Sequence, residues 1–308
     1  MENLGRKEFV KVKTILITGI TGFLGSYLAY RFLDRGYKVV GLKRSFSNIW
    51  RISDISGEIV LYDIDKADLT LIFKENKVDF VLHTATSYGR KKESISSIVE
   101  ANLLFPLKLL ELSIFFDVKV FFNTDTMLNK FVSPYSISKK QFLEWLSYFS
   151  KSVKVVNLRL EHIYGPKDDD NKFVIWLISQ LFGEANEINL TEGKQMRDFI
   201  YIEDVIDAYE IVVSNESFFK ESFNEIDIGS GNLLTIKDFV LTVYETVKKY
   251  KYIEKKMNFG AVPYRENEFI DIEKNLTPIY SLGWKPKTTI KEGLQKTIEW
   301  WMEHNHVT

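Results

Sequence analysis

The sequence predicts an α/β fold in which a doubly wound parallel sheet is followed by a smaller C-terminal α/β lobe. Short β-rich segments alternate with amphipathic helical segments over the first half of the chain, a pattern typical of a parallel sheet with helices on both faces. Three closely spaced glycines follow the first of these strands directly. After about residue 165 the alternation becomes irregular and the loops lengthen.

The elements follow from local patterns. Runs rich in β-branched and aromatic residues predict strands, and apolar residues at helical spacing predict helices. Gly36 stands where a helix would end in a left-handed cap, and Pro134 precedes a helix expected to begin near Tyr135. The strands are predicted over 14–18, 38–42, 59–62, 80–83, 119–123 and 154–158, and helices over 24–35, 98–116 and 290–303.

We expect two lobes, spanning 1–165 and 166–308, with some segments crossing between them. No linker rich in proline, glycine or serine separates them. The lobes should therefore pack tightly and share a cleft.

Composition excludes several classes of protein. The 308 residues carry 41 basic and 42 acidic side chains, without the basic excess of a nucleic-acid-binding surface. The absence of cysteine rules out disulfides and thiolate chemistry. No apolar run approaches the roughly 18 residues that span a bilayer, and the N-terminal segment has no apolar signal core. We expect a cytoplasmic protein without a metal, a membrane or a nucleic acid as partner; a solvated loop explains the acidic run 168–170 better than a cation site.

The glycines form a G-x-x-G-x-x-G motif between the first strand and the first helix. Glycines at these places allow a sharp turn and let the backbone approach a pyrophosphate, which then meets the amides at the start of the helix. The motif predicts a Rossmann-type dinucleotide site; the alternative is a turn needed only for helix–sheet packing. The expected cofactor contacts here are Gly19, Thr21, Gly22, Phe23, Leu24 and Gly25.

The second strand suggests which dinucleotide binds. Lys43 and Arg44 stand where an NAD-binding protein places an acid for the ribose 2′-hydroxyl. Two cations suit a 2′-phosphate instead and predict NADP(H); an exposed basic pair is the alternative. Asp63, with Ile64 beside it, ends the third strand and is placed to accept from the adenine amino group, although it could equally cap a loop.

Thr124, Tyr135 and Lys139 are the predicted catalytic residues. Tyr135 and Lys139 share one helix face, one turn apart, and Thr124 ends a strand at the edge where open parallel sheets bind ligands. We expect the ammonium to lower the pKa of the phenol, which is ordinarily near 10. Tyr135 would then exchange a proton with a carbonyl oxygen that receives a hydride, while Thr124 stabilises that oxygen.

These motifs, taken together, resemble the extended short-chain dehydrogenases/reductases of the nucleotide-sugar epimerase/dehydratase family. The resemblance covers nearly the whole chain. It implies a cofactor-binding Rossmann domain and a C-terminal lobe that holds a nucleoside-diphosphate sugar. The matching segments are TGITGFLG (18–25), LHTAT (82–86), NTD (123–125), YSISK (135–139), LRLEHIYGP (158–166), EGKQMRDFIYIEDV (192–205), IGSGN (228–232) and LGWKP (282–286).

The resemblance also implies roles for further residues. Arg197 and Arg265 would grip the diphosphate, with surface ion pairs as the alternative. His162 would contact the sugar nucleotide or, equally, be a buried structural histidine. The other implied cofactor contacts are Thr84, Ala85, Thr86 and Asn102, besides Tyr135 and Lys139; the other implied substrate contacts are Ser87, Tyr88, Asp125 and Lys172.

Departures from the family pattern narrow the expected chemistry. Dehydratases carry an acid where Thr126 stands, which leaves Asp125 as the remaining carboxylate and argues against dehydration. Lys43 and Arg44 predict NADPH, a reductant that the reaction consumes. Epimerases of the family typically retain and recycle NAD, so the predicted cofactor favours a reductase.

Within the family, the segments LHTATSYGRK, FFNTDT and RENE (265–268) are similar to those of bacterial reductases that form CDP-abequose and CDP-paratose. This similarity implies NADPH-dependent reduction of the 4-keto group of CDP-4-keto-3,6-dideoxyglucose, on a route to lipopolysaccharide O-antigen sugars. An NAD-dependent epimerase and a deoxyheptose 4-ketoreductase remain alternatives. Family members commonly form homodimers, and Phe115, Phe142 and Trp145 would serve that interface or belong to the core.

Overall fold

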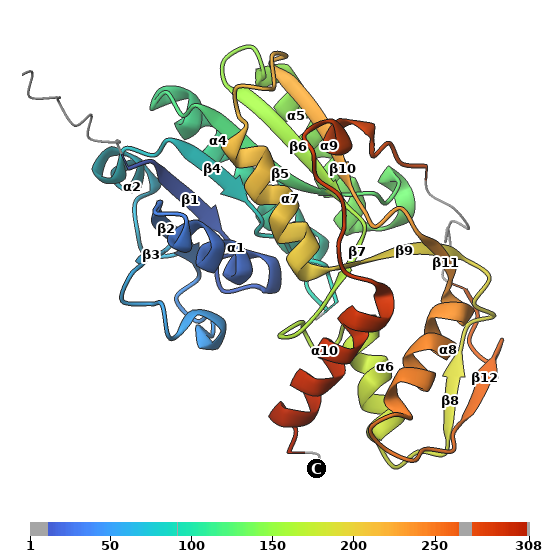
Figure 1. Ribbon diagram of the computed structural model, residues 1–308. Coiled ribbons are helices and arrows are strands. Elements are labelled where there is room, and N and C mark those ends of the chain that lie inside the picture. Colours follow the sequence, from blue (N-terminus) through green and yellow to red (C-terminus); the bar gives the residue numbers. More distant parts are fainter. Residues whose placement is uncertain (1–11, 91, 265–272, 307–308) are drawn as a thin grey trace, which may run out of the picture.

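The computed structural model describes residues 12–90, 92–264 and 273–306, arranged as Figure 1 shows. Within these residues seven strands form one sheet in the order β10-β6-β5-β4-β1-β2-β3, and every neighbouring pair is parallel. This is the doubly wound Rossmann order with β10 added at one edge, so the predicted fold class is confirmed. The strands are β1 (Thr14–Thr18), β2 (Lys38–Lys43), β3 (Val60–Asp63), β4 (Phe80–His83), β5 (Val120–Thr126), β6 (Lys154–Leu160) and β10 (Phe223–Ile228).

Both faces of this sheet are buried, which is why its strands read as continuous apolar runs. Side chains alternate between faces along a strand: Ile15 and Ile17 join the core under α1 and α7, whereas Leu16 joins the core under α2, α4 and α5. The helices around the sheet are α1 (Phe23–Asp34), α2 (Leu69–Asn76), α3 (Ile95–Val99), α4 (Phe105–Phe115), α5 (Pro134–Phe149) and α7 (Ile202–Ser214), with short turns η1 (Trp50–Ile52) and η3 (Lys130–Val132).

Two local signals set the end of α1 and the start of α5. Gly36 follows α1 with φ +77°, as the predicted left-handed cap requires. Pro134 opens α5, and the side chains of Ser133 and Ser136 each bond the other's backbone N–H in a capping box. The start of α5, one residue before Tyr135, is therefore firmly fixed.

The helix predicted over 98–116 is interrupted. A π-helical turn, η2 (Glu100–Leu104), joins α3 to α4. Such turns often occur at functional sites, and this one contains Asn102, whose side chain is fully buried.

The C-terminal lobe holds a three-stranded sheet, β11-β9-β7, and a two-stranded sheet, β12-β8. However, two segments that follow residue 165 belong to the first lobe: β10 is part of the main sheet, and α7 lies beside α1, as Figure 1 shows. The chain therefore crosses between the lobes after residue 165. No helix in the described part is long and apolar enough to cross a membrane. The remaining elements are β7 (His162–Tyr164), α6 (Phe173–Phe182), β8 (Glu187–Leu190), β9 (Met196–Tyr201), β11 (Leu233–Thr235), α8 (Ile236–Val247), β12 (Lys256–Phe259), α9 (Thr277–Ser281) and α10 (Ile290–His304).

Candidate active site

The glycine loop is packed too closely for a side chain at Gly19 or Gly25. A Cβ on Gly25 would overlap the carbonyl oxygen of Gly19. Gly19 itself has φ +64°, and a Cβ there would lie 2.8 Å from the Cα of Ala85. Gly22 occupies the N-cap of α1, so no side chain covers the first amides, and the first turn carries no acid. An uncapped helix start behind a tight glycine turn fits the pyrophosphate of a dinucleotide.

Thr18 holds the segment after β4 against this loop. Its hydroxyl accepts hydrogen bonds from the amides of Thr84 and Ala85, at 3.1 and 3.0 Å. That hydroxyl therefore donates its hydrogen to Nδ1 of His83, 2.9 Å away. Burial keeps the pKa of His83 well below its ordinary value, with the Lys139 charge adding to the effect. The neutral imidazole thus serves as an acceptor.

Asn102 holds the residues that follow Ala85 in place. Its Oδ1 accepts from the Ser87 amide at 2.7 Å and from the Thr86 hydroxyl at 3.1 Å. Its Nδ2 donates to the Ser87 carbonyl and to the Ser138 hydroxyl on α5. One buried amide therefore fixes the segment after β4 to the helix that carries Tyr135.

Two threonines at the end of β5 face the two tyrosines of the site. Thr124 and Thr126 share one face of the strand. The Thr124 hydroxyl lies 2.7 Å from that of Tyr209 on α7. The side chain of Thr126 lies close enough to Tyr135 to lower the pKa of the phenol, and its hydroxyl accepts from the Leu128 amide at 3.2 Å. The residue that replaces the dehydratase acid is therefore a neighbour of Tyr135.

Tyr135 is half-buried beneath another aromatic ring. The rings of Tyr88 and Tyr135 have centroids 4.9 Å apart, and Nζ of Lys172 lies 3.6 Å from the centroid of Tyr88, a cation–π contact. Three residues predicted from sequence thus stack from the C-terminal lobe to the phenol. Burial raises the pKa of Tyr135 well above 10. The expected lowering of this pKa by Lys139 is wrong, because desolvation is the largest cause of the shift and the smaller causes that lower the pKa are Thr126 and Arg90.

Lys139 is buried one turn along α5. Desolvation is the main cause that lowers its pKa to about 8, and the Lys140 charge contributes, whereas Asp125 acts in the opposite direction. Near neutral pH its ammonium is charged yet loses its proton readily.

Asp125 faces away from the threonines and is engaged in an ion pair. Its Oδ2 accepts from Nζ of Lys140 at 2.8 Å, and its Oδ1 accepts from the Thr126 amide. The carboxylate is 2% exposed. Its predicted contact with substrate remains a prediction, since this geometry uses it to hold the end of β5 against α5.

The two cations of the predicted 2′-phosphate site, Lys43 and Arg44, differ in their surroundings. Among the described residues, Lys43 has an ion-pair partner and Arg44 has none. Lys43 forms an ion pair with Asp63, and the Ile64 amide bonds to the Lys43 carbonyl at 2.8 Å. Arg44 is exposed, with its guanidinium 4.8 Å from the centroid of Phe46. Asp63 thus offsets the charge of Lys43 and leaves Arg44 as the cation open to a ligand.

Two of the predicted sugar-nucleotide residues, His162 and Arg197, lie on the three-stranded sheet of the C-terminal lobe. His162 is exposed on β7, with its ring 5.7 Å from that of Phe199, so the alternative of a buried structural histidine is wrong. Arg197 on β9 is 7% exposed and donates to the Met196 carbonyl. Arg265 lies outside the described residues.

Comparisons with known proteins agree with this geometry. Residues 15–226 match the model of the NAD dependent epimerase/dehydratase family. The chain belongs to this family. CDP-abequose synthase from Salmonella muenchen is 31% identical over 299 residues, which cover 93% of this chain and 97% of that protein. The corresponding enzyme of Salmonella typhimurium is equally similar.

Solved structures of the family share the fold. The UDP-glucose 4-epimerase of Thermotoga maritima, crystallised with UDP-glucose, superposes with a TM-score of 0.79 at 23% identity, covering 95% of this chain and 99% of that one. The UDP-glucose 4-epimerase of Thermus thermophilus, in complex with NAD, superposes with a TM-score of 0.78 at 23% identity, covering 94% of this chain and 98% of that one.

Two residues of this family member escaped the sequence analysis. Arg51 is buried and joins the lobes: its guanidinium contacts the carbonyls of Thr21 and Lys167 and the carboxylate of Asp169. Tyr209 reaches Thr124 from α7. Neither lies in a chemical motif, and no local spacing connects either one with its partners.

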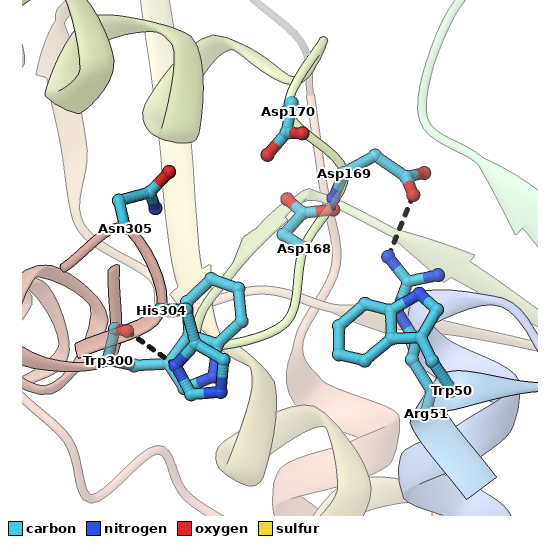
Figure 2. A pocket seen from close by; sticks show the side chains of 8 residues that line it. All are labelled: Trp50, Arg51, Asp168, Asp169, Asp170, Trp300, His304 and Asn305. Carbon is cyan, nitrogen blue, oxygen red and sulfur yellow. Dashed lines mark hydrogen bonds and ion pairs between the residues drawn. The ribbon is translucent and has the colours of Figure 1, made fainter. Parts of the chain in front are cut away.

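A pocket of about 350 Å³ opens beside Arg51, at the junction of the lobes (Figure 2). Its walls bring together η1, the acidic loop and the end of α10. Asp168, on this loop, is 4% exposed, and desolvation raises its pKa to about 7. The predicted solvated loop is therefore wrong for Asp168. The lining residues are Trp50, Arg51, Asp168, Asp169, Asp170, Trp300, His304 and Asn305.

Asp168→Asn should stabilise the protein at pH 8 but not at pH 4. Between the ordinary pKa and the raised one, the native state retains a proton that the unfolded chain has released, so wild-type stability falls as pH rises through this range. At pH 8 we expect the free energy of unfolding of the variant to exceed that of the wild type by on the order of 3 kcal/mol. Urea unfolding at both pH values measures this difference. Asp170→Asn, exposed on the same loop, should differ little from wild type; equal stability of wild type and Asp168→Asn at pH 8 would contradict the burial argument.

Proposed function

We propose that the protein is an NADPH-dependent nucleotide-sugar 4-ketoreductase. Its substrate would resemble CDP-4-keto-3,6-dideoxyglucose, and its product would serve bacterial cell-surface polysaccharide (O-antigen) synthesis. The observation that carries the proposal is a half-buried Tyr135 beneath the ring of Tyr88 at the start of α5, in a chain 31% identical to CDP-abequose synthase along 93% of its length. The dinucleotide would supply the hydride.

The protonation state of Tyr135 supports reduction. Reducing a ketone consumes one proton, so the phenol must start protonated, whereas oxidation of a sugar hydroxyl starts with a phenolate. Burial raises the pKa of Tyr135, which keeps the phenol protonated and ready to donate. Thr124 would hydrogen-bond the same oxygen, and Lys139 would hold the nicotinamide ribose hydroxyls.

The substrate would lie between the lobes. Arg197 and Arg265 would bind the diphosphate, for which guanidinium groups are well shaped. Lys172 would approach the same anion from the mouth of the C-terminal lobe, where it now contacts Tyr88. Ser87, Asp125 and His162 complete the proposed set.

The second candidate is an NAD-dependent epimerase. It is favoured by the structural likeness to UDP-glucose 4-epimerases, one of them in complex with NAD. The protonated Tyr135 favours the reductase, and so do Lys43 and Arg44, since two cations suit the 2′-phosphate of NADPH. A reductase of a 4-keto-6-deoxyheptose nucleotide would use the same residues.

Incubation with NADPH and a CDP-4-keto-3,6-dideoxyhexose should consume the reduced cofactor. Tyr135→Phe should lower kcat by at least about 100-fold, because general-acid catalysis contributes that much or more. Absorbance of the reduced nicotinamide measures the rate. Tyr148→Phe, exposed on the same helix, should retain full activity. Full activity of Tyr135→Phe, or tightly bound NAD in the purified protein together with epimerisation, would refute the reductase.

Arg44→Ala should weaken NADPH binding by roughly one to two decades and leave NADH binding unchanged, because a charge-assisted hydrogen bond is worth roughly 1.5–3 kcal/mol. Fluorescence titration with both cofactors measures the two affinities. Lys66→Ala is the control, since Lys66 is exposed and lies beside Asp63. Equal losses for both cofactors would remove Arg44 from 2′-phosphate recognition.

We also propose a homodimer formed through α4 and α5. Phe115, Trp145 and Tyr148 are exposed on these helices, whereas Phe142 is fully buried and belongs to the core. Sedimentation should give about twice 36.0 kDa. The double variant Phe115→Lys, Tyr148→Lys should sediment as a monomer, whereas Tyr252→Lys, exposed elsewhere, should not. A monomeric wild type would overturn this proposal.

A further inference from the structure

Tyr209 directs its hydroxyl at a catalytic residue from the opposite layer of the fold. Its side chain is 1% exposed and belongs to the apolar core under α7. Thr124 lies 85 positions earlier in the chain, and the two hydroxyl oxygens are 2.7 Å apart. A hydroxyl buried among apolar side chains needs a partner, and among the described residues this partner is Thr124.

The direction of this hydrogen bond follows from counting hydrogens. A phenol has one hydrogen, and so has a threonine hydroxyl. If Thr124 donated to Tyr209, the phenolic hydrogen would face the apolar core without an acceptor among the described groups. If Tyr209 donates, its hydrogen is satisfied and that of Thr124 remains available. Burial also raises the pKa of Tyr209, which keeps it a donor.

Thr124 is placed to use the hydrogen that this arrangement leaves available. It is half-buried at the end of β5 rather than sealed in the core. The neighbouring Thr126 hydroxyl accepts from the Leu128 amide, whereas the Thr124 hydroxyl has Tyr209 as its partner among the described residues. With Tyr209 as the donor, the hydrogen of Thr124 has no acceptor in the described part of the protein.

We propose that Tyr209 is a positioning residue: it donates to Oγ of Thr124 and so directs the Thr124 hydrogen toward the carbonyl oxygen of the substrate. Accepting one hydrogen bond also makes a hydroxyl a stronger donor in the next one. The inference rests on the proposed function insofar as Thr124 must meet a carbonyl oxygen at the site of hydride transfer. It assigns Tyr209 no contact with substrate or cofactor.

A double-mutant cycle between Tyr209→Phe and Thr124→Val tests this assignment. Phenylalanine keeps the ring in the core and removes only the hydroxyl. We expect Tyr209→Phe to lower kcat roughly tenfold and leave KM within about twofold, since the interaction is made mainly in the transition state. In the Thr124→Val background the same change should alter kcat by less than about twofold, because the hydroxyl through which Tyr209 acts is gone.

Tyr164→Phe is the matched control. Tyr164 is also 1% exposed, and its hydroxyl contacts the Ile290 carbonyl. It should leave kcat unchanged, which separates loss of any buried tyrosine hydroxyl from loss of this one. An undiminished kcat in Tyr209→Phe would overturn the inference. So would an equal loss in the wild-type and Thr124→Val backgrounds, because Tyr209 would then act through the fold.

The choice of substrates separates this inference from the reductase proposal. Hydride transfer is followed with the CDP-keto sugar and NADPH, and also with UDP-glucose and NAD⁺. A wild type that transfers hydride only with UDP-glucose would refute the reductase, yet the cycle measured on that transfer would still decide the role of Tyr209.

Discussion

The close backbone packing around Gly19 is the constraint on which the site depends. The oxygen of Gly19 lies where a side chain on Gly25 would be, and Ala85 lies where one on Gly19 would be. Thr18 closes this contact by binding the amides of Thr84 and Ala85. The start of α1 and the end of β4 are thereby held at one edge of the sheet, where a dinucleotide can meet bare amides. Every later part of the site is positioned relative to this contact.

Short-range patterns predicted the fold well. The strand at 14–18 and the glycine cap at 36 are as expected, because turn chemistry and strand patterning are local. The strand at 119–123 extends further, to Thr126, since pairing with β6 continues past the apolar run. Asn102 was found through the family resemblance, but the π-helical turn that buries it carries no spacing signal of its own.

Partners that are distant in sequence could not be predicted. Tyr209 contacts Thr124, 85 positions away in the sequence, and Arg51 contacts Asp169 in the other lobe. The local sequence around Tyr209 is that of an ordinary amphipathic helix, and that around Arg51 is a short turn, so neither indicates its partner. Tyr135 shows a second limit. Its spacing to Lys139 correctly placed both on one helix, but the pKa depends on burial beneath Tyr88, which is a property of tertiary packing.

The two faces of β5 carry side chains with different roles, as Asp125 and the two threonines show. Successive residues of β5 point to opposite faces, so Asp125 is withdrawn into an ion pair with Lys140 while Thr124 and Thr126 face the tyrosines. A carboxylate on the face of the threonines would repel a developing negative charge on a substrate oxygen, whereas hydroxyls can donate to it. With a threonine at 126 this face carries neutral hydroxyls, an electrostatic environment that suits the proposed reduction of a ketone.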